Sequence, residues 1–113
     1  MSEVSGNTGG DSNGGSYADG SALTVLLGDG ARVKILAALL SEDSRDFNVT
    51  DIARLAGVSR NTVYKHLDEL VSIGVVEESR KIGDSRMYQI NRSSETAKKL
   101  AEIEWDLMDS MFE

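Results

Sequence analysis

Apolar residues recur at helical spacing between residues 22 and 41. The pattern predicts an amphipathic helix that begins near Gly30 and carries its apolar stripe on Val33, Ile35, Leu36, Ala37, Leu39 and Leu40. Asp29 is the expected N-cap, because its side-chain oxygen can accept a hydrogen bond from a first-turn amide. The stretch ALTVLL ahead of it predicts a separate short helix or a turn that ends at Gly28, and SEDSRD predicts a polar loop.

Two more helices are predicted around a tight turn. The short β-prone piece FNVT comes first, and Thr50 is the expected N-cap of a helix that Gly57 closes. Ser59 is expected to cap the next helix, which runs from Arg60 to about Ile73 and ends before Gly74. Its buried face is predicted to consist of Val63, Leu67, Leu70 and Val71.

A hairpin and a last helix complete the predicted order. The stretch VVEESRKIGDSRMYQIN alternates around the turn IGDS and predicts two short strands. A long helix capped by Ser93 or Ser94 follows, with the sequence SETAKKLAEIEWDLMDSMF. Helix, short strand, helix, turn, helix, hairpin, helix is the order of a winged helix-turn-helix, which is mainly α with a small β-hairpin wing.

Composition sets the expected boundaries. Residues 1–21 are rich in Gly, Ser, Asn and Asp and are expected to form a disordered acidic tail. Residues 22–92 are the expected winged-helix domain, and residues 93–113 the expected dimerisation helix. The tail lacks a basic start and an apolar run, so neither a signal peptide nor a membrane span is expected, and the protein is predicted to be cytoplasmic.

The chain offers little material for catalysis. It has no cysteine and a single histidine, His66, so disulfides, thiolate metal sites and thiol chemistry are excluded. The sequence contains no Gly-rich phosphate loop and no nucleophile elbow. We therefore expect no enzyme, no metal and no cofactor.

The helix that begins at Arg60 carries the candidate DNA-reading residues. On a helical wheel the side opposite the apolar stripe holds amide, hydroxyl and ammonium groups, which can bond to base edges or contact a thymine methyl. The helix N-terminus also favours a phosphate. The expected contacts are Ser59, Arg60, Asn61, Thr62, Tyr64, Lys65 and His66. The competing interpretation is an ordinary solvated helix face, with His66 a flank or packing residue and Tyr64 covering the core edge.

The hairpin supplies a second candidate contact. Arg80, Lys81 and Arg86 bracket the turn, and extended basic side chains there can straddle phosphates or reach a minor groove. Asp84 at the turn tip does not fit a phosphate contact, and its expected role is to form the turn.

The formal net charge of −7 is unevenly distributed. Residues 1–21 hold three acids and no base, and residues 93–113 hold six acids and two lysines. Residues 22–92 hold ten basic and ten acidic side chains and are neutral. The acidic excess therefore lies outside the segment predicted to meet a polyanion.

From Arg32 to Asn91 the sequence resembles the archaeal and bacterial winged-helix regulators of the ArsR and MarR-like group. The resemblance rests on DIARLAGVSRNTVYKHLDEL and on the wing GVVEESRKIGDSRMYQIN. It implies a transcriptional regulator that binds double-stranded DNA. Some ArsR-type relatives sense metals through cysteines, and that mode does not transfer to a chain without cysteine. A small-molecule effector remains an open question.

The last helix is apolar around more than half of its circumference. One small domain cannot bury so wide a face, so a second surface is expected to cover the rest. The resemblance also implies dimerisation through terminal helices. The predicted homodimer contacts are Leu100, Ile103, Trp105, Leu107, Met108, Met111 and Phe112. The alternative is that this helix packs only on the chain's own segment 22–27.

Two functions follow from these features. The first is a homodimeric regulator that reads a pseudo-palindromic operator through helix 59–73 and a wing at 80–86, with half-sites about 10–10.5 base pairs or a multiple apart. The second is a winged-helix module that binds a protein partner without reading bases. The acidic excess, more Arg than Lys and the absence of Cys also resemble proteins of salt-loving archaea.

Overall fold

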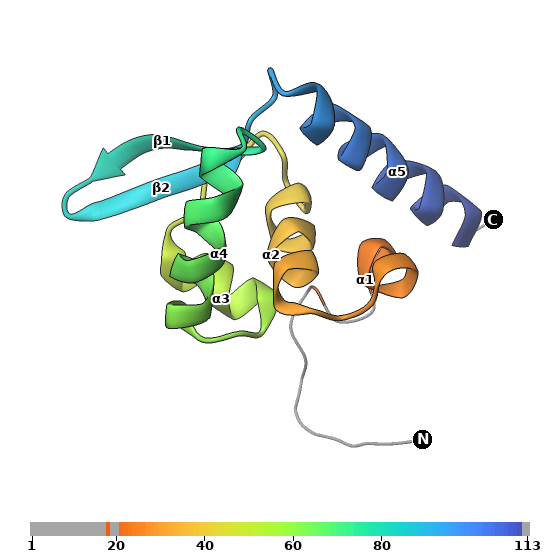
Figure 1. The fold of residues 1–113 in the computed structure, drawn as a ribbon, viewed down its shortest axis with the longest axis horizontal. Helices are drawn as coiled ribbons and strands as arrows, with labels where there is room; N and C mark the ends of the chain where they lie inside the picture. The colour runs from red at the N-terminus through yellow and green to blue at the C-terminus, as the bar shows by residue number, and fades with distance from the viewer. Residues whose placement is uncertain (1–17, 19–20, 112–113) are drawn as a thin grey trace.

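The computed structural model describes residue 18 and residues 21–111, and it confirms the predicted fold class. Five helices and one antiparallel hairpin follow each other in the predicted order (Figure 1). Their bounds are α1 Ala22–Leu27, α2 Ala31–Leu40, α3 Val49–Ala56, α4 Arg60–Ser72, β1 Val76–Ile82, β2 Ser85–Ile90 and α5 Glu95–Met111. None of the helices in these residues is both long and apolar enough to cross a membrane. Most of the predicted tail, and Phe112, lie outside the described residues.

The core lies where α1 to α4 meet the base of the hairpin. Its largest fully buried side chains are Phe47, Leu23, Ile35, Leu39, Ile52, Leu67, Val63 and Val76. α4 buries Val63, Leu67 and Leu70, as predicted, but Val71 keeps 38% of its surface exposed, so its assignment to the buried face is wrong. One residue step turns a helix by about 100°, which carries Val71 from the buried side of Leu70 to the edge of the stripe.

Two predicted helix caps are also wrong. α2 begins after Gly30, an extended residue without a side-chain cap, rather than after Asp29. α3 is capped by Asn48, whose Oδ1 accepts a hydrogen bond from the Asp51 amide at 2.8 Å, while Thr50 already lies inside the helix. The preceding residue, Phe47, pairs with β2, and this pairing places the extended Asn48 at the helix start.

The predicted turn between α3 and α4 is confirmed. Gly57 ends α3 with a φ of 73°, a left-handed conformation that glycine adopts without steric cost. Ser59 then caps α4, and its Oγ accepts a hydrogen bond from the Thr62 amide at 3.1 Å. The Gly57 turn therefore sets the direction of α4 relative to α3.

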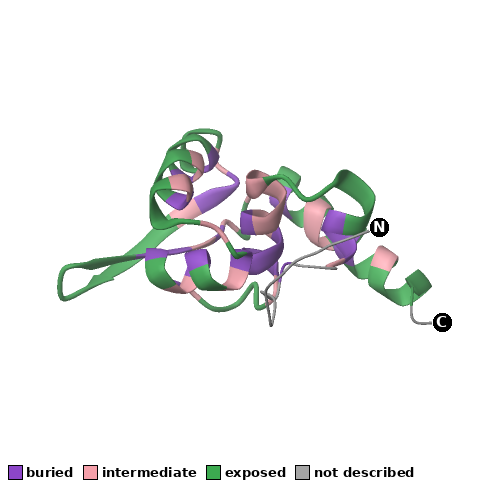
Figure 2. Cartoon of the chain, turned by 90° about the horizontal axis from the view of Figure 1, so that it is seen from below, coloured by how far each residue is buried: buried purple, intermediate pink, exposed green. Residues whose placement is uncertain are grey.

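The hairpin is tied to the core by a backbone bridge. Phe47 and Tyr88 exchange two amide-to-carbonyl hydrogen bonds of 2.8 Å each. Only Phe47 of the β-prone piece FNVT pairs in this way, since Val49 and Thr50 begin α3. Farther out, β1 contains a bulge at Ser79, and Gly83 and Asp84 form the predicted turn. The outer half of the hairpin projects into solvent (Figure 2).

The end of the predicted acidic tail takes part in the fold. Ala18 is fully buried, and its amide donates to the Leu55 carbonyl at 3.0 Å. Ser21 caps α1, which the sequence left open as a helix or a turn. For these two residues the expectation of disorder is wrong, because a backbone hydrogen bond and a helix cap hold them.

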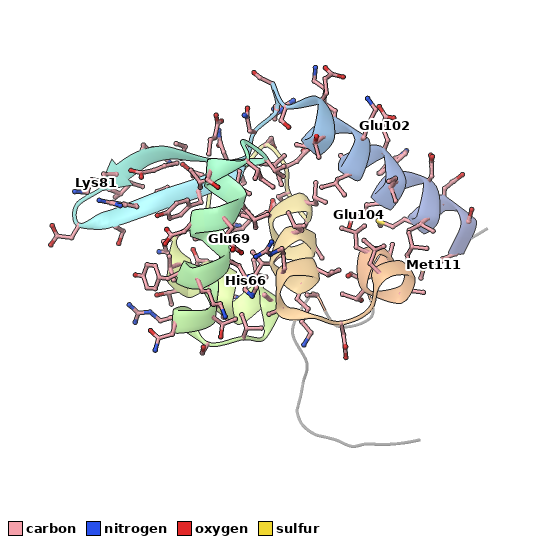
Figure 3. The ribbon with its side chains drawn as sticks, in the orientation of Figure 1. His66, Glu69, Lys81, Glu102, Glu104 and Met111 are labelled. Atoms are coloured by element: carbon pink, nitrogen blue, oxygen red, sulfur yellow. The ribbon has the colours of Figure 1, made fainter. Side chains whose placement is uncertain are left out.

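α5 lies against α1, and Ser94 caps it by accepting from the Ala97 amide at 3.1 Å. Its most buried residues are Ala97 and Glu104. Glu104 keeps 6% of its surface, and its Oε1 has no hydrogen-bond partner among the described residues. Figure 3 shows Glu104 on the side of α5 that faces α1, and burial raises the pKa of its carboxyl.

The Glu104→Gln substitution should stabilise the protein near neutral pH. A raised folded-state pKa means that the neutral carboxyl suits the fold, so Glu104 contributes most below its ordinary value of 4.5 and loses that contribution as pH rises through the folded value. We expect the variant to gain on the order of 1 kcal/mol at pH 7 over the parent, and the difference to close in acid. Urea unfolding across this pH range measures it.

Glu102→Gln is the matched control, since it removes the same charge from an exposed position of the same helix. Its free energy of unfolding should stay within about 0.5 kcal/mol of the parent. Equal effects of the two substitutions would show that burial of Glu104 does not matter.

Candidate nucleic-acid interface

The first two turns of α4 present the predicted reading residues to solvent. Arg60, Asn61 and Lys65 are exposed, and Thr62 is half-buried. Among the described residues neither Arg60 nor Lys65 takes part in an ion pair within 4.0 Å, so both cations are open to an anion. The Ser59 and Thr62 hydroxyls lie 2.8 Å apart and bond to each other, which fixes them at the helix start.

His66 points to the other side of α4. Its Nδ1 accepts a hydrogen bond from Arg32 Nε of α2 at 3.1 Å, and the same guanidinium pairs with Glu69 one turn later (Figure 3). Burial, and then the neighbouring charges of Arg32 and Lys65, lower the pKa of His66 below 6.5. The ring is therefore neutral at pH 7 and joins α4 to α2, which agrees with a packing role.

An open groove of about 390 Å³ separates α4 from the hairpin. Its walls come from the start of α3, the exposed side of α4 and the outer half of the wing, with the lining residues Asn48, Val49, Thr50, Arg60, Tyr64, Asp68, Asp84, Ser85, Arg86 and Tyr88. Tyr64 keeps 48% of its surface, so about half of it is open to solvent beside this groove. The groove brings Arg60 and Arg86 to one surface, together with the acids Asp68 and Asp84.

The three predicted wing cations differ in their surroundings. Lys81 is exposed near the outer end of the hairpin (Figure 3). Arg86 lies 4.0 Å from Glu78 on the paired strand, a loose contact. Arg80 is engaged far more tightly, since its Nε and Nη2 donate to the two Asp46 oxygens at 2.8 and 3.2 Å.

Asp46 belongs to the site although the sequence did not indicate it. Its carboxylate also accepts from Ser79 Oγ at 2.6 Å. The hydrogen bonds from Arg80 and then from Ser79 lower the pKa of Asp46 to about 2, so it stays charged throughout the neutral range. Asp46 and Arg80 are 34 residues apart in sequence, and no local pattern links them.

Arg32 is the second residue that sequence reasoning missed. Its helix shows only an apolar stripe in sequence, and its contacts with His66 and Glu69 arise from the packing of α2 on α4. No group of three or more His, Asp or Glu side chains suited to a metal ion occurs within the described part of the chain.

Comparisons with known proteins agree with this geometry. Residues 27–79, which run from the end of α1 to the middle of β1, match the family model described as a helix-turn-helix domain. The fold is similar to the crystal structure of Sso10a-2, a DNA-binding protein from Sulfolobus solfataricus, with a TM-score of 0.51 and 19% identity over 74% of this chain and 85% of that one. At this identity the likeness is one of fold, and no curated protein matches the chain. The match and the element order together describe the fold as a helix-turn-helix with a hairpin wing, that is, a winged helix-turn-helix.

Proposed function

We propose that the protein is a transcriptional regulator that reads sequence in double-stranded DNA. The observation that carries the proposal is the exposed start of α4, where Arg60, Asn61 and Lys65 face solvent and no acidic residue lies between Arg54 and His66. A helix presented by a tight turn is the element that other helix-turn-helix proteins insert into the major groove.

Each exposed side chain of α4 has a defined role in this proposal. Asn61 can form paired hydrogen bonds with adenine, and Lys65 can donate to guanine. Arg60 and the Ser59 cap lie at the helix N-terminus, where amide groups and side chains bind a phosphate. Tyr64 faces the groove toward the wing and can bond to a second phosphate through its hydroxyl.

The wing supplies backbone contacts beside α4. Lys81 and Arg86 are exposed, and Arg86 lines the same groove as Arg60, so one sugar–phosphate strand can meet both. Asp68 and Asp84 line that groove too and oppose a phosphate close to them. The expected path of the strand therefore runs along Arg60 and Arg86, away from the two acids.

We also propose that the protein acts as a homodimer through α1 and α5. These neighbouring helices expose large apolar side chains that the folded monomer does not cover, namely Val25, Leu26, Leu27, Ile103, Trp105, Met108 and Met111. Trp105 alone keeps 73% of its surface. Exposed apolar side chains on two neighbouring helices, with a tryptophan among them, are typical of protein interfaces. The α1–α5 contact expected under the alternative is present, and it still leaves this surface exposed.

The symmetry of the proposed dimer predicts the symmetry of its DNA site. Two α4 helices related by a two-fold axis read a pseudo-palindrome, with half-sites about one helical turn or a multiple apart. Within this function we place the protein in the ArsR and MarR-like group, and we infer from the net charge of −7 that it works at high salt. At high salt counterion release contributes less to binding, so base contacts and shape must contribute more.

A protein interaction module is the second candidate function. The same exposed apolar side chains of α1 and α5 favour it, because they fit a different protein as well as a second copy. The two functions differ in their dependence on α4, since a module that binds through α1 and α5 does not need Arg60 or Lys65.

Replacing Arg60 and Lys65 together by Ala should weaken binding to a short duplex by about a hundredfold, because one phosphate contact and one base contact are lost. Fluorescence anisotropy with a duplex obtained by selection from a random pool measures the affinity. The matched control replaces Lys98 and Lys99 of α5 by Ala, which removes the same charge away from α4, and should change affinity by less than about threefold. Unchanged binding by the α4 variant contradicts the groove assignment.

Trp105→Glu should convert the proposed dimer into a monomer. Placing a charge at the most exposed of these apolar side chains should raise the dissociation constant by about thirtyfold or more. Light scattering coupled to chromatography over a range of concentrations measures the mass. Ile73→Glu is the control, since Ile73 is 66% exposed at the end of α4 and outside this surface. A parent protein that stays monomeric at every concentration would rule out the dimer.

A further inference from the structure

We propose that Asp46 is a positioning residue that fixes the wing through Ser79 and Arg80, and that Arg80 serves this attachment rather than a DNA phosphate. The inference rests on the proposed function, because it assigns the wing cations to different tasks. Asp46 lies in the loop before α3, directly next to Phe47, so it belongs to the core side of the molecule. Ser79 and Arg80 belong to β1 of the wing.

The contact geometry is that of a specific attachment. Asp46 keeps only 12% of its side-chain surface and accepts three hydrogen bonds, from Ser79 Oγ at 2.6 Å and from the Arg80 guanidinium at 2.8 and 3.2 Å. The two bonds from Arg80 use its planar fork against both carboxylate oxygens, the arrangement that adds directional specificity to an ion pair. A lysine at residue 80 would lack this fork.

The bulge in β1 places both partners on Asp46. Glu78 pairs with Tyr88 and Arg80 pairs with Met87, so Ser79 is the extra residue of β1 between the two pairs. A bulge bends a strand and redirects its side chains. Here the consequence is that consecutive residues, Ser79 and Arg80, both reach one carboxylate across the strand edge.

This attachment is the outermost one on the wing, so it controls the direction of the residues beyond it. Inside it lies the Phe47–Tyr88 bridge with its two backbone bonds, and both of these residues are buried. Outside it, residues 81–86 are all exposed. A two-stranded hairpin is marginally stable by itself in water, so the last attachment sets the direction of its free half. That half carries Lys81 and Arg86, the cations proposed to meet DNA.

The same contact separates Arg80, which is paired with an acid, from the two wing cations that are open to DNA. Asp46 neutralises Arg80, and Arg80 in turn shields the DNA from an acid that is charged at all neutral pH values. The Asp46 carboxylate already occupies the Nε and Nη2 donors of Arg80, so a phosphate beside Arg80 would share the guanidinium with this acid and would be attracted less strongly. Among the described residues, Lys81 has no ion pair within 4.0 Å, and Arg86 has only the 4.0 Å contact with Glu78.

The dependence of duplex affinity on salt separates the two roles of Arg80. Each phosphate contact contributes about 0.9 to the slope of log K against log salt concentration. We expect Arg86→Ala, the matched control on the partner strand, to make the slope shallower by about 0.9. Arg80→Ala should lower affinity about fivefold and leave the slope unchanged, because it removes an attachment and not a phosphate contact. A shallower slope for Arg80→Ala, equal to that of Arg86→Ala, would overturn the proposal.

Amide hydrogen exchange without DNA tests the attachment itself. Asp46→Asn and Arg80→Ala should each reduce the protection of the amides from Ser79 to Met87 about fivefold, while the amides of α2 stay as in the parent. Unchanged protection of the wing in both variants would overturn the positioning role. If the parent binds no duplex, the proposed function fails, and hydrogen exchange still decides whether Asp46 holds the wing.

Discussion

The backbone bridge between Phe47 and Tyr88 is the contact on which the rest of the structure depends. It joins the loop before α3 to β2, with two hydrogen bonds of 2.8 Å in the core. On one side it sets Asn48 as the cap of α3, and through the Gly57 turn it sets the direction of α4. On the other side it anchors the wing and brings Asp46 to Ser79 and Arg80. The bridge therefore positions both α4 and the wing, and it sets the distance between them.

An acidic chain can present a surface to a polyanion when its own acids are used internally. Glu69 pairs with Arg32, and Asp46 pairs with Arg80, so two acids beside the interface are already neutralised. The cations left open among the described residues near α4 are Arg60 and Lys65. The formal charge of −7 thus says little about the local potential at the start of α4. Under the proposed function, the small number of open cations makes selectivity depend on the geometry of a few side chains.

The sequence predicted the elements well because their signals are local. Gly57, Ser59 and the IGDS turn each act within a few residues, and they place the turn, the start of α4 and the hairpin correctly. Helix caps were predicted less well. Asp29 and Thr50 are good cap residues, but the helices begin after Gly30 and Asn48 instead. The Asp46–Arg80 pair and the buried Glu104 escaped prediction altogether, because both depend on the packing of segments distant in sequence.

Amide chemical shifts on titration with a short duplex test the central claim most directly. If α4 and the wing form the interface, the largest changes will fall in residues 59–66 and 81–86, and the amides of the outer face of α5 will stay unchanged. Changes confined to α1 and α5, or no change at a molar excess of duplex, would contradict the account.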